Sequence, residues 1–208
     1  MSDTVLIPGG RDVRATLDAA AGDDTRSEAV VVACPPHPRH GGHRGDERLV
    51  AASDALTDRG IDCLRFDYGA YDEGYGECTD ADNAVGWALD RYARVGLFGY
   101  SFGGTVALVA AASGPKLAGV CALAPTDRLA SEIDAVAALD DLAARGASVR
   151  IVYANRDATV DWEPVVERAR ELGLEVVELD ADHFLVGRAG DAAEPVAEAF
   201  GRWLRGEE

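Results

Sequence analysis

One segment constrains the fold of this chain more than any other: an apolar stretch with closely spaced glycines on both sides of a serine. Its sequence is Val95-Gly96-Leu97-Phe98-Gly99-Tyr100-Ser101-Phe102-Gly103-Gly104, and the apolar run 106–112 follows. A strand, then Gly-x-Ser-x-Gly, then a helix is the pattern of a nucleophile elbow, in which glycines leave room for backbone around a strained serine. The segment therefore predicts a strand–turn–helix unit that raises Ser101 at the carboxyl edge of a sheet.

Glycine-rich turns also occur in nucleotide-binding folds, where they let a helix pack closely on a sheet. Those folds carry a Gly-x-Gly-x-x-Gly turn or a phosphate-loop lysine. Neither accompanies Ser101, and the one lysine of the chain is Lys116. We therefore interpret the motif as a nucleophile elbow.

Short β-branched runs alternate with longer alanine-rich amphipathic runs along the rest of the chain. This alternation is typical of a mostly parallel sheet with helices on both faces. Strands are predicted at 13–17, 29–34, 62–66, 95–100, 118–123, 149–154 and 175–179. Helices are predicted at 47–59, 81–92, 102–112, 133–145, 162–172 and 195–205. No connection is long enough for an inserted lid domain, so residues 1–208 are expected to form one three-layer α/β domain.

The formal net charge of −17 restricts the classes of partner. The chain has 20 basic residues against 37 acidic ones. Phosphate backbones and anionic lipids bind basic stripes, which this sequence does not offer, so nucleic acid and membrane are not expected as partners. An acidic, lysine-poor surface resembles that of proteins from salt-loving organisms, where high ionic strength screens self-repulsion.

Segments that would export the protein or hold it in a bilayer are not recognised in the sequence. The longest uninterrupted apolar run, 106–112, is far shorter than the roughly 18 residues of a membrane span. The N-terminus, Met1-Ser2-Asp3-Thr4-Val5, lacks the basic start and apolar stretch of a secretory signal. We therefore expect a cytoplasmic location.

The cysteines do not form a redox or metal motif of their own. Cys34, Cys63 and Cys121 lie in apolar strand-like runs, and no Cys-x-x-Cys pair occurs. Buried free thiols are therefore expected rather than disulfides. No cofactor is expected either.

A base and an acid for Ser101 are both available downstream. A serine hydroxyl is a weak nucleophile until an imidazole takes its proton and a carboxylate orients that imidazole. His183 is the one histidine that follows Ser101, in a loop after the last predicted sheet strand. Asp157 follows the strand predicted at 149–154, at the same edge of the sheet, which gives the chain order Ser, Asp, His.

Three other aspartates lie near this edge. Asp127 ends the preceding strand, in Ala124-Pro125-Thr126-Asp127, and could reach the same histidine from one strand nearer. It is the alternative to Asp157. Asp161 and Asp182 are interpreted as solvated or capping carboxylates.

Prolines restrict the backbone donors of the loop after the strand at 29–34. This loop has the sequence Pro35-Pro36-His37-Pro38-Arg39-His40-Gly41-Gly42-His43. It lies where the second donor of an oxyanion hole is expected, and its three prolines have no N–H to offer. The N–H of His37 is therefore the expected donor, with that of Arg39 second, alongside the N–H of Phe102.

The same loop could instead hold zinc. Cys34, His37, His40 and His43 recur every third residue, which could place them on one face of a turn. A proline-stiffened loop that serves the serine explains these residues without an ion. No metal is therefore assigned.

These segments resemble the α/β-hydrolase superfamily, specifically its small, lidless, dienelactone-hydrolase-like members. The resemblance covers residues 13–204, and Pro35 replaces the first histidine of the family's loop. Its other motifs are Leu64-Arg65-Phe66-Asp67-Tyr68-Gly69, Tyr71-Asp72-Glu73-Gly74-Tyr75-Gly76-Glu77, the elbow 99–104, Asn155-Arg156-Asp157, and Asp182-His183-Phe184 with Gly187-Arg188. The turn at 69–71 is shorter than in the family. The resemblance implies an α/β-hydrolase fold, a serine nucleophile and an acyl-ester substrate.

We therefore expect a serine hydrolase of carboxylesterase type that cleaves a small carboxylic ester or thioester through an acyl-enzyme intermediate. Ser101, Asp157 and His183 would be the catalytic triad, and the N–H groups of Phe102 and His37 the oxyanion hole. The expected partner is the small-molecule ester or thioester, and a homodimer is left open. Two alternatives are a non-catalytic binding protein of the same fold, and an acyltransferase or peptidase with the same triad.

Overall fold

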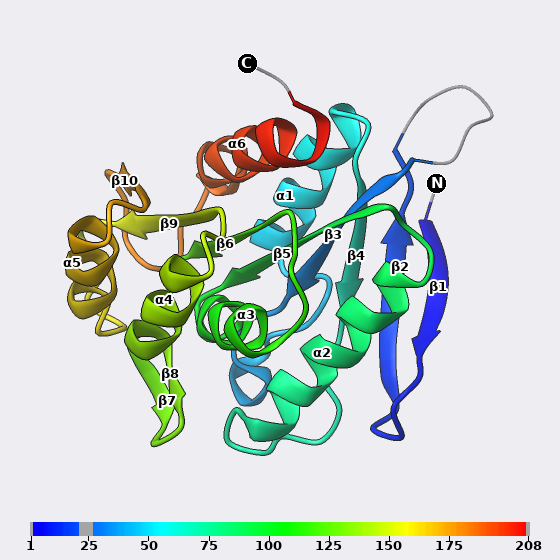
Figure 1. The fold of residues 1–208 in the computed structure, drawn as a ribbon, viewed down its shortest axis with the longest axis horizontal. Coiled ribbons are helices and arrows are strands. Elements are labelled where there is room, and N and C mark those ends of the chain that lie inside the picture. The colour runs from blue at the N-terminus through cyan, green and yellow to red at the C-terminus, as the bar shows by residue number, and fades with distance from the viewer. Residues whose placement is uncertain (1, 21–26, 207–208) are drawn as a thin grey trace.

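The computed structural model describes residues 2–20 and 27–206, and its centre is an eight-stranded sheet (Figure 1). The strands are β1 (Ser2–Ile7), β2 (Val13–Asp18), β3 (Ala29–Cys34), β4 (Asp62–Phe66), β5 (Arg94–Tyr100), β6 (Gly119–Leu123), β9 (Val149–Ala154) and β10 (Glu175–Leu179). Their order in the sheet is β1-β2-β4-β3-β5-β6-β9-β10. Only β1 with β2 and β2 with β4 pair antiparallel, so the sheet is mostly parallel, as predicted. Met1, the first residue of the N-terminal segment considered above, lies outside the described residues.

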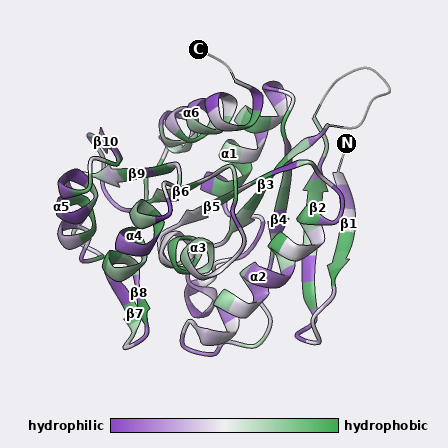
Figure 2. Cartoon of the chain, in the orientation of Figure 1, coloured by the Kyte–Doolittle hydropathy of each residue, from purple (hydrophilic) through white to green (hydrophobic). Residues whose placement is uncertain are grey.

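Helices cover both faces of the sheet, which gives the predicted three layers. α2 (Tyr75–Leu89), α3 (Phe102–Ser113), α4 (Ala135–Ala144) and α5 (Glu163–Glu171) pack on one face. α1 (Glu47–Asp58) and α6 (Ala189–Phe200) pack on the other. Figure 2 shows α5 as largely hydrophilic, in keeping with its place beside the outermost strands. None of the helices among the described residues is long and apolar enough to cross a membrane.

β3 shows why the sequence forms a strand buried on both sides. Val30, Val32 and Cys34 belong to the core on the α2–α5 face. The alternate positions, Ala29, Val31 and Ala33, belong to the core on the α1–α6 face. Alternating side chains of a strand point to opposite faces, so a continuous apolar run is required where helices cover both.

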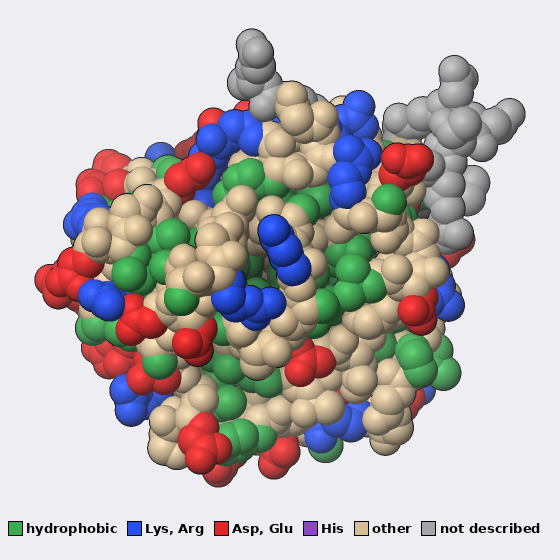
Figure 3. Space-filling view, in the orientation of Figure 1, with side chains coloured by type: hydrophobic (Ala, Val, Ile, Leu, Met, Phe, Trp, Pro, Cys, Tyr) green, Lys and Arg blue, Asp and Glu red, His purple; other side chains and the backbone are tan. Residues whose placement is uncertain are grey.

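Charge is dispersed over the outside of these layers. Figure 3 shows acidic side chains scattered over the face in view, most densely over α5 and β10. Many arginines pair with them, as in the ion pair between Arg168 and Asp140. Surface pairs of this kind contribute little to stability individually, so the core carries the fold.

The cysteines behave as the sequence predicts. Cys34, Cys63 and Cys121 are free and buried, and Cys78 is free and half-buried. Burial raises the pKa of Cys63 and of Cys121 to about 12. These two thiols are therefore protonated and unreactive at neutral pH.

Two helices, α2 and α6, begin well before their predicted starts. α2 begins at Tyr75 rather than at residue 81, because the buried Glu77 carboxylate accepts the N–H groups of Gly74 (2.9 Å) and Asp72 (3.0 Å) and so caps an earlier turn. α6 begins at Ala189 rather than at 195, so Pro195 lies inside the helix. The apolar face of α6 already includes Ala192 and Ala193, and this packing outweighs the backbone hydrogen bond that proline removes.

Three short strands are absent from the predictions. β1 pairs with β2 as a hairpin at the edge of the sheet, where half-exposed strands carry polar residues. β7 (Arg128–Ala130) and β8 (Ile133–Asp134) form a separate small hairpin. Because Ile133–Asp134 is extended, α4 begins at Ala135 instead of the predicted residue 133.

The turn from β5 to α3 requires glycine at two positions. A Cβ on Gly99 would lie 1.9 Å from the carbonyl oxygen of Gly103. A Cβ on Gly103 would lie 2.3 Å from the carbonyl oxygen of Cys34 and 2.4 Å from that of Pro35. The start of α3 therefore packs directly on the backbone at the end of β3.

We predict that Gly103→Ala lowers the free energy of unfolding by about 2 to 4 kcal/mol, because the colliding atoms belong to backbone and cannot rotate away. Denaturant unfolding would measure the change. Gly86→Ala is the matched control, since Gly86 lies within α2 and a Cβ there meets nothing within 4 Å. That variant should gain about 0.5 to 1 kcal/mol. Equal behaviour of the two variants would contradict the prediction.

Candidate active site

Ser101 lies between β5 and α3 in a backbone conformation that is unusual for a residue with a side chain. Its φ is 56° and its ψ is −122°. Its N–H donates to the carbonyl of Leu123 (2.8 Å), and its own carbonyl accepts the N–H of Gly104 (2.8 Å). These bonds hold a strained conformation that presents the hydroxyl at the carboxyl edge of the sheet. The residue is 8% exposed, so the hydroxyl lies in a largely enclosed position.

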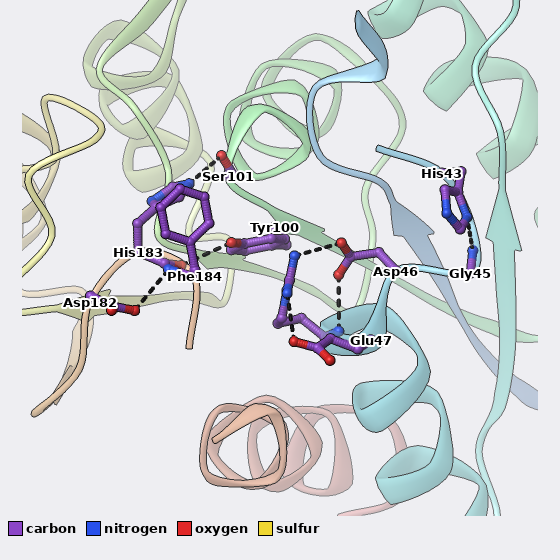
Figure 4. A network of polar contacts seen from close by, with 10 residues as sticks. His43, Gly45, Asp46, Glu47, Tyr100, Ser101, Asp182, His183 and Phe184 are labelled. Carbon is purple, nitrogen blue, oxygen red and sulfur yellow. Dashed lines mark hydrogen bonds and ion pairs between the residues drawn. The ribbon is translucent and has the colours of Figure 1, made fainter. Parts of the chain in front are cut away.

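His183 and Asp157 complete a hydrogen-bonded chain with Ser101. The Oγ of Ser101 lies 2.9 Å from Nε2 of His183, as Figure 4 shows. Nδ1 of His183 lies 2.6 Å from Oδ2 of Asp157. Both the imidazole and the carboxylate are buried. The structure thus brings together the three residues that the sequence predicts as a triad.

Asp157 is fixed by the turn that follows β9. Its Oδ1 accepts the N–H of Thr159 (2.8 Å) and that of Val160 (3.4 Å). This leaves Oδ2 for the imidazole. Because an ionised carboxylate only accepts hydrogen bonds, Nδ1 of His183 must carry the proton of this bond. In the neutral imidazole this tautomer leaves Nε2 as an acceptor for a hydrogen bond from the hydroxyl of Ser101.

The alternative carboxylate, Asp127, is directed elsewhere. Its Oδ1 accepts the hydroxyl of Thr126 (3.3 Å), and its N–H donates to the carbonyl of Asp161 (3.0 Å). The side chain of Asp161 is exposed. Asp182 accepts the N–H groups of Phe184 (3.1 Å) and Leu185 (3.0 Å), so it caps the histidine loop as predicted.

Two backbone donors beside Ser101 have no partner among the described residues: the N–H of Phe102 and the N–H of His37. The rings of the same two residues lie 4.8 Å apart, so the β3 loop and the start of α3 meet here. The N–H of Arg39 is occupied, because it donates to Nδ1 of His37 (3.2 Å). Of the two donors predicted from the loop, the structure leaves His37 available.

A cavity of about 510 Å³ opens over these groups. Ser101, His183, His37 and Phe102 all contribute to its lining. Apolar side chains, those of Leu129, Val160 and Phe184, line other parts of it. A volume of this size accommodates a small organic molecule.

The histidine loop does not assemble a metal site. His37 and His40 stack on each other with ring centroids 4.4 Å apart, while Nδ1 of His43 accepts the N–H of Gly45 (2.9 Å) away from Ser101 (Figure 4). Among residues 2–20 and 27–206, no group of three or more His, Cys, Asp or Glu side chains is placed to hold a metal ion. The zinc ligands considered from the spacing therefore do not converge.

Sequence reasoning missed Tyr100 and Arg48, which line the same cavity. The hydroxyl of Tyr100 donates to the backbone carbonyl of His183 (2.9 Å). The guanidinium of Arg48 lies 4.8 Å from the centre of the Tyr100 ring. Strand alternation was the available signal for Tyr100, since it places this residue on the α1–α6 face.

The pKa of His37 lies below its usual value of 6.5, first because of partial burial and then because of the neighbouring His40. A neutral imidazole is also what the loop needs, since Nδ1 accepts the N–H of Arg39. Protonation would convert this acceptor into a donor and break the bond.

We predict that this loop becomes less stable at acidic pH. The unfolded chain takes up a proton at His37 more readily than the folded one, so the stability present above about pH 6.5 is lost as the pH falls through the lower folded pKa. The test compares free energies of unfolding for wild type and His37→Asn, whose oxygen can accept the same N–H without titrating. Between about pH 7.5 and about pH 5, the free energy of unfolding should fall more for wild type than for His37→Asn. Parallel curves for the two proteins would contradict the prediction.

Comparisons with known proteins agree on the architecture. No family model and no curated protein matches the sequence, but 660 chains of solved structures match the fold. An α/β serine hydrolase homologue from Coxiella burnetii has a TM-score of 0.79 at 23% identity, covering 94% of this chain and 96% of that one. A serine hydrolase without a lid, from Xanthomonas campestris, has a TM-score of 0.78 at 21% identity and 97% and 94% coverage.

An esterase from Pyrococcus furiosus has a TM-score of 0.76 at 19% identity, covering 98% of this chain and 91% of that one. These likenesses extend over nearly the whole chain. Among the described residues no further domain is inserted between the elements of the sheet. The chain has the α/β-hydrolase fold, in its lidless form.

Proposed function

We propose that this chain is a serine hydrolase of carboxylesterase type that cleaves a small carboxylic ester or thioester. The observation that carries the proposal is the continuous hydrogen-bonded chain from Ser101 through His183 to Asp157 beside two unpartnered N–H groups. A serine, an imidazole and a carboxylate in this order activate a hydroxyl for attack on an acyl carbon. The names of the serine hydrolase and esterase neighbours support the same class of reaction.

In the first half-reaction, Oγ of Ser101 attacks the carbonyl carbon while Nε2 of His183 takes the hydroxyl proton. Asp157 orients the imidazole and stabilises the imidazolium. The N–H groups of Phe102 and His37 donate to the oxyanion of the tetrahedral intermediate. His183 then returns the proton to the departing alkoxide or thiolate, which leaves the acyl group on Ser101.

In the second half-reaction, water attacks the acyl carbon and His183 again takes and returns the proton. The oxyanion forms at the same two N–H groups. The products are the carboxylic acid and free Ser101. No cofactor enters either step, and we assign none.

The cavity favours a small or flexible substrate. It has a volume of about 510 Å³, and its wall includes the exposed ring of Phe184. An apolar acyl or leaving group would lie against Leu129, Val160 and Phe184, while the ester carbonyl points toward the two N–H groups. Deep enclosure of a long chain would need a covering domain, which the described residues do not supply.

We predict that a fluorophosphonate labels wild type at one site and does not label Ser101→Ala. Asp157→Asn should lower kcat/KM for short-chain aryl or thiol esters by about 10³-fold or more, because the imidazole loses its orienting carboxylate. Asp127→Asn is the matched control and should keep activity within about threefold. Assays belong in molar salt, which screens the net charge of −17.

Three results would redirect the assignment. Labelling that survives Ser101→Ala would refute the nucleophile. Absence of both labelling and ester cleavage would favour a binding protein with this fold. A dominant transfer product with added alcohol, or selective cleavage of a peptide library, would favour the acyltransferase or the peptidase.

A further inference from the structure

The residue before the nucleophile is bonded to the backbone of the base. The hydroxyl of Tyr100 donates to the carbonyl of His183 (Figure 4), over 2.9 Å. The tyrosine is 1% exposed. Ser101, the next residue, lies 2.9 Å from the imidazole of the same histidine. Two consecutive residues of the β5–α3 turn therefore contact His183, one through its main chain and one through its ring.

Two planar groups lie beside the Tyr100 ring. The guanidinium of Arg48 lies 4.8 Å from the ring centre, and the imidazole of His183 lies 5.6 Å away at an interplanar angle of 30°. Arg48 is held in turn by ion pairs to Asp46 (2.7 Å) and Glu47 (2.8 Å) at the start of α1. The phenol is thus fixed from the α1 side as well as from the histidine side.

The other backbone anchors of the histidine loop lie before and after His183, including the cap that Asp182 provides to Phe184 and Leu185. The carbonyl of Ala181 accepts the N–H of Arg156 (3.0 Å), and Leu185 is buried, but Phe184 and Val186 are 53% and 76% exposed. Among the described residues, Tyr100 supplies the hydrogen bond to the main-chain carbonyl of His183, while Ser101 and Asp157 bond to its ring. Without it, the buried carbonyl would lack its donor and the backbone there could rotate, which would swing Nε2 away from Ser101.

We propose that Tyr100 is a positioning residue: its hydroxyl fixes the main chain of His183 so that the imidazole stays within hydrogen-bonding distance of Ser101. This inference rests on the proposed hydrolase function. The hydroxyl acts on the base through the backbone and takes no part in proton transfer. Arg48 supports this role by packing over the ring of the phenol.

The phenol remains a donor at every pH at which the enzyme would be assayed. Burial raises the pKa of Tyr100 to about 12. The bond to the His183 carbonyl therefore persists over the whole pH range of the assay. Loss of this bond should therefore lower the rate without shifting the pH at which the rate rises.

The test compares Tyr100→Phe with Tyr92→Phe. Tyr92 is also buried, at 5% exposure, and its hydroxyl donates to Oδ2 of Asp62 (2.8 Å) in another part of the fold. Each variant loses one buried hydroxyl, so both should lose stability. We expect Tyr100→Phe alone to lower kcat, by about three- to tenfold with KM unchanged, and to slow fluorophosphonate labelling equally. A kcat equal to that of Tyr92→Phe would overturn the proposal.

A second readout needs no substrate. The Nδ1 proton of His183, held by Asp157 over 2.6 Å, should give a low-field NMR signal that is absent in His183→Gln. In Tyr100→Phe this signal should broaden and exchange faster with water, whereas in Tyr92→Phe it should persist. An unchanged signal in Tyr100→Phe would refute the positioning role even if no ester is cleaved. A protein that shows the signal change but no hydrolysis would refute only the proposed function.

If Tyr100→Phe does not fold at the assay temperature, the same measurements on Arg48→Gln test the proposal. This variant keeps the hydroxyl and removes the cation that packs on its ring. A kcat lowered by about twofold or more at constant KM, together with a broadened low-field signal, would support the proposal. Unchanged kcat and an unchanged signal would contradict it.

Discussion

Everything in the site depends on the close backbone contact between the start of α3 and the end of β3. Gly103 lies so near the carbonyls of Cys34 and Pro35 that no side chain fits between them. This contact sets the β3 loop beside the elbow and brings His37 next to Phe102. The unpartnered N–H groups of His37 and Phe102 lie close together because the glycines of the β5–α3 turn let this turn pack against the end of β3.

The parallel sheet brings the remaining groups to the same edge. Ser101 follows β5, the turn of Asp157 follows β9, and the histidine loop follows β10. Since adjacent parallel strands end at the same side, residues widely separated in sequence need only short loops to meet. The hydrogen bonds of Asp157 to its own turn then select which of its oxygens faces the imidazole.

The sequence predicts what depends on residue type and spacing. The sequence predicts every strand of the parallel part from a short run rich in apolar and β-branched residues, and β3, which is covered on both faces, is apolar throughout. The starts of α2 and α6 were missed because they depend on a capping carboxylate, Glu77, and on the packing of Ala192 and Ala193, neither of which has a periodic signature. The sequence already predicts His37 ahead of Arg39 as donor, but the hydrogen bond that occupies the Arg39 N–H is seen only in the structure.

The nucleophile and the base are constrained unequally. Tyr100 packs in the core on the α1–α6 face, and Phe102 packs in the core on the α2–α5 face. The two neighbours of Ser101 are therefore held by helix layers on opposite faces of the sheet. The histidine loop contributes only to the α1–α6 core, through Ala181 and Leu185. A group held from one side has more freedom than a group held from two. The distance between hydroxyl and imidazole is therefore governed mainly by the histidine loop, and a hydrogen bond from the elbow to the His183 backbone acts where that freedom is greatest.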